Sequence, residues 1–327
     1  MPLVFTGGVL AFVATGPFWA HQTASAGVGA PEEPTRLQEL TEQWVGELFP
    51  GDPALLQEHL DDARARRLAA GRQVFQDYCL GCHGELADGA GAAAAMLVPR
   101  PRNFRSGVDA DSPPIFKFRS TASGEAPLPQ DLESTIRNGL PGSSMPAHRL
   151  LDPSDVAAAA DYLLYVAMTS EFRQAVRLGY EDEEPDLADP AATAEFFTGT
   201  VASEAERIAA RYVSPRVLAI SAETPNDAAS VARGREVYTR QGCFECHGAS
   251  GRGDGSSSAA LLDNWGFPID PRDFSTGQFR AGGGSRDLYL RIKGGVAGTP
   301  MPAYEDLPEP ETWDLIHFVQ SLATEAR

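Results

Sequence analysis

The residues of this sequence with the clearest capacity for chemistry are its four cysteines, because each pair is followed directly by a histidine. The two copies of this CxxCH pattern are Cys79, Cys82 and His83, and Cys243, Cys246 and His247. On a helical turn, sulfurs three residues apart lie on one face, where they can form thioethers with the two vinyl groups of one porphyrin. The adjacent imidazole then reaches the iron. This spacing predicts two covalently bound haem c groups, with His83 and His247 as proximal ligands.

Four cysteines also have two other possible uses. Two disulfides would consume all of them, and so would one zinc site built from two CxxC units. Neither accounts for the histidine that follows each pair, so haem is the favoured interpretation.

An internal repeat surrounds the two CxxCH segments. The shared landmarks, in order, are residues 71–75 (GRQVF) and 234–238 (GREVY), residues 101–104 (PRNF) and 271–274 (PRDF), and Met145 and Met301, each followed by Pro-Ala. Each copy is therefore a complete haem-binding unit. Since a thioether is a suitable sixth ligand, we predict Met145 and Met301 as the distal ligands.

Four other side chains could compete for the iron. Met96 and Met168 lack the shared Met-Pro-Ala context, and we expect both to pack in a core. His148 and His317 are alternative distal ligands, and their other interpretation is a surface or a packing histidine.

Haem also carries two propionates, which favour a guanidinium partner. Arg102 and Arg272 occupy the same place in the two Pro-Arg landmarks, so we predict that they bind propionates. Trp265 either donates its indole hydrogen to a propionate or packs as a core aromatic.

The charge distribution limits the partners. The 327 residues, 43% of them apolar, are enough for two domains, and 45 acids against 27 bases give a net charge of −18. Nucleic-acid binding is excluded, since it requires clustered positive charge. The net negative charge is concentrated in residues 1–65 and 171–228, and this favours redox partners with a basic docking surface.

The N-terminus predicts export. Residues 1–31 contain no charged side chain, and the apolar stretch 3–20 precedes Ala24-Ser25-Ala26, which is similar to a signal cleavage site. The stretch is long enough to leave a retained membrane anchor as the alternative. Both interpretations place the rest of the chain in the periplasm or on the outer face of the cytoplasmic membrane.

On these motifs both units resemble class I c-type cytochrome domains, which implies an all-α fold. We expect the following division: a signal or anchor at 1–26, an acidic extension at 27–65 with an amphipathic helix over 37–48, domain 1 at 66–170, an acidic linker at 171–228 and domain 2 at 229–327. A lead-in helix is expected over 63–78, a terminal helix from 152 to about 168, and helical structure over 191–213. We expect the extension to pack on the first domain.

The resemblance also raises one question about the site. Similar domains often have a proline about ten residues after the proximal histidine whose carbonyl orients the imidazole. Here the corresponding stretches, residues 91–94 and 255–258, contain no proline, so the acceptor is unassigned.

Two His/Met-ligated haems imply an electron carrier rather than an enzyme, because neither iron has an open position. We predict a dihaem cytochrome c that passes single electrons between a donor and an acceptor protein, in a respiratory chain or as a subunit of an oxidoreductase complex. The alternative is a dihaem enzyme, a peroxidase or a sulfur-compound dehydrogenase, with one labile distal ligand. A mainly structural haem subunit is a third interpretation.

Overall fold

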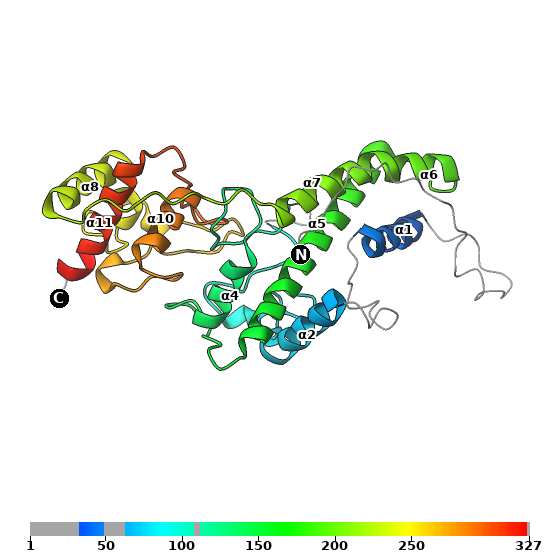
Figure 1. Cartoon of the computed structure of the whole chain (residues 1–327), viewed down its shortest axis with the longest axis horizontal. Helices are drawn as coiled ribbons and strands as arrows, with labels where there is room; N and C mark the ends of the chain where they lie inside the picture. The colour runs from blue at the N-terminus through cyan, green and yellow to red at the C-terminus, as the bar shows by residue number, and fades with distance from the viewer. Residues whose placement is uncertain (1–32, 49–62, 108–111, 326–327) are drawn as a thin grey trace.

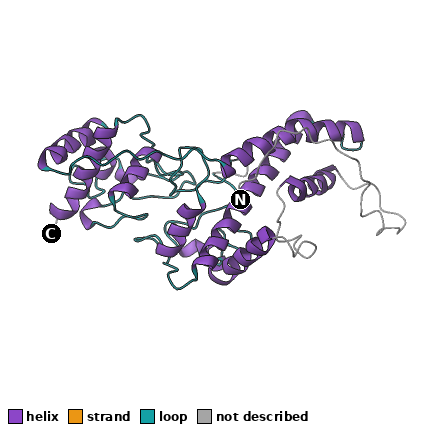
Figure 2. Ribbon diagram, in the orientation of Figure 1, coloured by secondary structure: helices purple, strands orange, loops and turns teal. Residues whose placement is uncertain are grey.

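The computed structural model describes residues 33–48, 63–107 and 112–325, and these fold into helices joined by loops (Figure 1, Figure 2). Within these ranges there are no β-strands, only two isolated β-bridges, so the all-α fold class is confirmed. None of the described helices has both the length and the apolar composition that a membrane span requires. The predicted signal or anchor, residues 1–26, lies outside the described residues.

The first CxxCH unit is built on two crossing helices, α2 (Ala63–Tyr78) and α5 (Pro153–Glu183). α5 begins at a proline, which costs no backbone hydrogen bond at the first helical position. At the crossing, a Cβ on Gly71 would lie 2.0 Å from the carbonyl oxygen of Ala158. Only glycine lets the two backbones approach so closely, and this explains the glycine in the first landmark of the repeat.

The second unit repeats this crossing with α8 (Ala228–Arg240) and α11 (Glu309–Glu325). Here a Cβ on Gly234 would lie 1.9 Å from the carbonyl oxygen of Asp314. The buried face of α11 carries Trp313, Ile316 and Phe318.

The remaining elements of the two units are short. Each unit has one helical turn at its CxxCH segment and one helix ahead of its methionine loop: α3 (Leu80–His83) and α4 (Pro129–Asn138) in the first, α9 (Phe244–His247) and α10 (Ser285–Gly294) in the second. Three 3-10 turns complete the loops: η1 (Ala94–Met96), η3 (Ser258–Ala260) and η4 (Phe274–Thr276).

α5 is longer than the sequence predicts. The expected end near Met168 is wrong, because buried side chains at Phe172 and Val176 continue the apolar face and the helix runs to Glu183. Its far half packs in a second hydrophobic core with α1 (Glu33–Leu48), α6 (Pro190–Phe196), the π-helical turn η2 (Phe197–Val201) and α7 (Ala202–Val213). We call these elements the accessory helix cluster. The helical structure expected over residues 191–213 is confirmed, but residues 171–213 form a packed core instead of a plain linker.

α1 confirms the helix expected in the N-terminal extension. Leu40 and Val45 are buried in the accessory helix cluster, and Glu42 accepts two hydrogen bonds of 2.7 Å from the guanidinium of Arg173 on α5. The extension therefore packs on the helix that also forms the first haem unit.

The segment between α7 and α8 contacts both units. In the first unit, the Ala122 N–H donates to the Arg216 carbonyl and the Leu218 N–H donates to the Ser120 carbonyl, both at 2.9 Å. Further along, Glu223 accepts a 2.9 Å hydrogen bond from Ser285 Oγ of the second unit. This connection is thus fixed at both ends.

Candidate haem sites

The two CxxCH segments each form one short helical turn that carries half-buried, unpaired thiols. Burial raises the pKa of Cys79 and of Cys243 to about 11, so these two thiols are neutral at pH 7. Among the described residues, no three or more His, Cys, Asp or Glu side chains gather as a metal ion would require. The structure therefore supports neither the two disulfides nor the four-cysteine zinc site.

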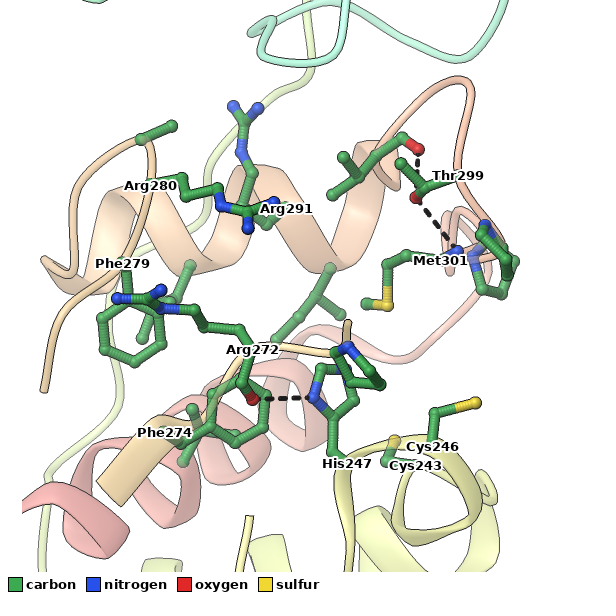
Figure 3. Close-up of a pocket in the computed structure, with 18 of the residues that line it drawn as sticks. Cys243, Cys246, His247, Arg272, Phe274, Phe279, Arg280, Arg291, Thr299 and Met301 are labelled. Atoms are coloured by element: carbon green, nitrogen blue, oxygen red, sulfur yellow. Dashed lines mark hydrogen bonds between the residues drawn. The ribbon is translucent and has the colours of Figure 1, made fainter. Parts of the chain in front are cut away.

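The two predicted proximal histidines face the carbonyl acceptor that the sequence leaves unassigned. His83 Nδ1 lies 3.1 Å from the carbonyl oxygen of Arg102, and His247 Nδ1 lies 3.2 Å from that of Arg272 (Figure 3). If Nδ1–H donates to this carbonyl, Nε2 is left free of its proton as an iron ligand requires. Burial lowers the pKa of both imidazoles, which favours the neutral form. The acceptor is thus the second residue of the Pro-Arg landmark.

The phenylalanine of the same landmark packs on the histidine ring. The ring centroids of Phe104 and His83 are 5.0 Å apart, and those of Phe274 and His247 are 4.4 Å apart. One four-residue landmark therefore both accepts a hydrogen bond from the imidazole and restricts the plane of the ring.

A glycine loop holds each landmark against its CxxCH turn. The Gly89 N–H donates to the His83 carbonyl at 2.8 Å, and the Gly253 N–H donates to the His247 carbonyl at 2.9 Å. Both glycines have positive φ, and a Cβ on either would come within 2.8 Å of the carbonyl oxygen of the landmark proline. The close approach accounts for the glycine-rich sequence that follows each CxxCH.

The two predicted distal ligands lie in loops of the same construction. Each methionine N–H donates to a hydroxyl two residues earlier, Met145 to Ser143 at 3.3 Å and Met301 to Thr299 at 3.2 Å. Each methionine carbonyl accepts an N–H from five residues earlier, at 3.1 Å in both loops. The Met-Pro-Ala sequence similarity therefore reflects one loop conformation used twice.

The competing side chains lie elsewhere. His317 is buried, and both of its ring nitrogens are engaged, Nδ1 with Ser230 Oγ at 2.6 Å and Nε2 with Glu223 at 3.2 Å, so it is a packing histidine. The ring of His148 packs edge-on against Tyr78.

The two other methionines differ from each other. Met168 is buried in the accessory helix cluster, as expected of a core residue. The same expectation is wrong for Met96, which is 79% exposed. It ends the short η1 turn, in which Ala94 is buried and Met96 faces solvent.

The second unit forms most of the wall of a cavity whose chemistry fits haem (Figure 3). Cys243, Cys246, His247 and Met301 line it together, and most of its wall is apolar: Leu288, Ile292, Val296, Leu315 and Val319. Across the cavity from the cysteines, the buried Nε atoms of Arg280 and Arg291 have no hydrogen-bond partner. A buried N–H group without a hydrogen-bond partner costs free energy, and a carboxylate could accept the hydrogen bond from each of these groups. Haem fits this arrangement, because its macrocycle is apolar and its propionates lie at the edge away from the vinyl groups that bind the cysteines.

The first unit brings its ligands to one core as well. Cys79 and Met145 both pack against the hydrophobic core that contains Phe75 and Phe104, and the His83 ring contacts both phenylalanines.

The two predicted propionate partners have different surroundings. The guanidinium of Arg102 lies over the ring of Trp265, and burial lowers the pKa of Arg102 to about 10. Arg272 lines the second cavity, and its Nε donates to the carbonyl of Gln278. Their role toward propionates stays a prediction.

Neither expectation for Trp265 is correct. Its Nε1–H donates to the carbonyl of Gly107 at 2.7 Å, and Gly107 belongs to the first unit. The half-buried indole therefore lies between the two units, a position that the sequence of one repeat cannot indicate.

Sequence reasoning also missed three cations near the sites: Lys117, Arg280 and Arg291. A signal for two of them was present in the repeat. Lys117 follows Phe116, whose ring lies 6.0 Å from that of Phe104, and Arg280 follows Phe279, whose ring lies 5.8 Å from that of Phe274.

Comparison with known proteins agrees with this geometry. Residues 66–163 match the family of cytochrome c oxidase, cbb3-type, subunit III, and residues 231–323 match the cytochrome c family. A solved chain of the reducing HAO-like protein complex from Kuenenia stuttgartiensis is 30% identical, with a TM-score of 0.59. The match covers 77% of this chain and 95% of that chain. None of the curated proteins matches.

Fold, sites and comparisons together define a c-type cytochrome, a class that carries covalently bound haem c and transfers electrons. The chain belongs to the dihaem c-type cytochromes that have two class I cytochrome c domains in tandem.

Proposed function

We propose that this protein is an exported electron-transfer subunit that passes single electrons through two His/Met-ligated haems between protein partners. One observation carries the proposal: the two sites are built alike, from the carbonyl that accepts the hydrogen bond of the histidine to the loop that presents the methionine. A dihaem enzyme needs one site that differs from the other, with a vacant or labile position.

When bound, haem c supplies the one-electron couple of its iron. The chain's own residues do the rest. His83 and His247 are held with Nε2 available, and the thioethers of Met145 and Met301 favour the ferrous state. The apolar wall of the second cavity limits the access of water. This also favours the ferrous state and so raises the reduction potential.

The similar chain from Kuenenia stuttgartiensis is part of a protein complex, and this supports a place for the present chain in a redox complex. The net charge of −18 favours partners with a basic docking surface. We expect reduction by such a partner to slow as ionic strength rises, in stopped-flow measurements from about 10 mM to about 150 mM salt. A rate independent of salt would contradict this docking mode.

The decisive experiment is a carbon monoxide difference spectrum of the fully reduced protein, combined with a haem count by pyridine haemochrome. Two haems per chain without carbon monoxide binding would support electron transfer through two closed sites. Two haems with one binding carbon monoxide would favour a dihaem enzyme with a labile ligand, and peroxide and sulfur substrates would then be assayed. A count below two would refute the proposed pair of haem sites.

We propose export because the N-terminal 31 residues are uncharged and contain an apolar stretch followed by a sequence similar to a signal cleavage site. N-terminal sequencing of the protein from fractionated cells tests this. A mature N-terminus near residue 27 in the periplasm would indicate a cleaved signal, an intact N-terminus in the membrane fraction would indicate an anchor, and cytoplasmic protein would refute export.

A further inference from the structure

A segment of the first domain is fixed against the second haem site. Arg119 donates through Nη2 to the Gly294 carbonyl at 3.0 Å. In return, Arg291 of α10 donates to the carbonyl of Arg119 at 2.8 Å and to that of Lys117 at 3.4 Å. These reciprocal bonds between domains leave the backbone of residues 117–119 little freedom.

The side chain of Lys117 lies at the cavity of the other domain. Lys117 and Phe118 line the cavity that also contains His247 and Met301, although both come from the first domain. The Arg291 guanidinium lies over the Phe118 ring, 5.4 Å from its centroid. The wall of the second haem site is therefore completed by the first domain.

The charges around Lys117 are not balanced. The positive charges of Arg102 and Arg280 disfavour the charged form of Lys117, and the negative charge of Asp263 favours it. Burial, followed by the repulsion from Arg102, lowers the pKa of Lys117 to about 8. Three cations against one acid in a half-buried position favour the binding of further anions.

The buried donors of the second cavity point to the same kind of ligand. The Nε atoms of Arg280 and Arg291 have no hydrogen-bond partner, and burial lowers the pKa of both side chains. The propionates of a haem bound to Cys243 and Cys246 are the anions that this cavity would contain.

Two observations also connect Lys117 with the first haem site. In the repeat it occupies the position of Arg280, directly after a phenylalanine that packs on the landmark phenylalanine. The positive charge of Arg102, whose carbonyl faces His83, also contributes to lowering the pKa of Lys117. The Lys117 ammonium thus interacts electrostatically with one cationic group of each site, Arg102 and Arg280.

We propose that Lys117 is an anion-binding residue shared by the two haem sites, where it compensates propionate charge of both haems. The proposal rests on the proposed function, because it assumes two bound haems. Reduction adds one negative charge to a haem, so a shared cation favours reduction at both. It also makes each site sensitive to the charge of the other.

The test is a spectroelectrochemical titration of the purified dihaem protein, fitted to two one-electron steps. Lys117→Gln is expected to lower the equilibrium constant for reduction about tenfold in both steps, which is about 59 mV for each electron. Arg280→Gln, which removes a charge from the second site, should shift mainly one step. Lys117→Arg retains the charge and should keep both potentials near those of the wild type.

Arg286→Gln is the matched control, because it removes one positive charge from an exposed position on α10. It is expected to change neither step. A shift of only one step in Lys117→Gln would refute the sharing, and no shift would refute any contact with propionate. The haem count and the carbon monoxide spectrum of each variant are recorded first, so a failure of the proposed function itself is seen separately.

Discussion

The guanidinium carbon of Arg102 lies 3.9 Å from the centroid of the Trp265 ring, and this contact joins the two cytochrome c domains. The same indole donates its hydrogen to the Gly107 carbonyl. One side chain of the second domain thus binds the first domain at two points, one of them the arginine whose carbonyl faces the predicted proximal histidine, His83.

Trp265→Ala is therefore expected to weaken the docking of the two domains. A cation–π contact contributes about 0.5–2 kcal/mol and a hydrogen bond about 1 kcal/mol. We expect the wild type to unfold in a single calorimetric transition, and this transition should broaden or separate into two in the variant. Trp265→Phe retains the ring and should lose only about 1 kcal/mol. If Trp265→Ala unfolds like the wild type, the indole does not hold the interface.

Met301→Ala is expected to open the second haem to external ligands while Cys243, Cys246 and His247 retain the haem. Carbon monoxide binding should rise from none to one equivalent per chain, and one reduction potential should fall. Met96→Ala is the control, because the Met96 side chain is 79% exposed. Carbon monoxide binding by Met96→Ala, or none by Met301→Ala, would contradict the assignment.

Gly234→Ala tests the helix crossing of the second domain. The added Cβ would lie 1.9 Å from the Asp314 carbonyl oxygen and 2.8 Å from the Phe318 Cβ, so α8 and α11 must separate. Such overpacking costs about 1–3 kcal/mol, which should appear as a lower thermal midpoint. Gly199→Ala, where a Cβ meets nothing within 4 Å, should not destabilise. Equal midpoints for the two variants would show that the crossing adapts.

Asp314 is expected to contribute to the loss of stability in acid. Burial alone would raise its pKa, but hydrogen bonds from Arg233, at 2.7 and 2.8 Å, and from Ser230, at 2.6 Å, lower the pKa below its usual 3.8. A carboxylate with a depressed pKa in the folded state stabilises at neutral pH, and this contribution is lost as the pH falls through that pKa.

The corresponding experiment measures urea midpoints of the wild type and of Asp314→Asn between pH 7 and pH 3. The variant should be less stable at pH 7 and should lose less stability below about pH 4. Parallel curves for the two proteins would show that another group controls the acid transition.

The repeat explains which parts of the candidate site the sequence can predict. Each haem needs its cysteines, histidine and methionine in fixed order, so Met145 and Met301 stand out in the sequence alone. The Arg102 and Arg272 carbonyls do not, because a backbone acceptor 19 or 25 residues away leaves no residue-type signal. The roles of Trp265 and Lys117 depend on how the two domains pack against each other, and the sequence of one repeat carries no information on this packing.

The end of α5 was missed for a related reason. Glu171 counts as an acid of the expected linker, but it is buried and accepts a hydrogen bond of 2.8 Å from Arg211 of α7. Burial raises its pKa, and the arginine partly offsets this. Charge counts along the chain cannot distinguish such a buried ion pair from a solvated acid.

The 31 residues of α5 extend over roughly 46 Å at 1.5 Å per residue. Its first half belongs to the core beside Met145, and its far half belongs to the accessory helix cluster. A partner that binds the cluster and tilts this helix would change the packing around the first haem without touching it. Protein assembly and the potential of that haem can thus be linked mechanically through a single rigid element.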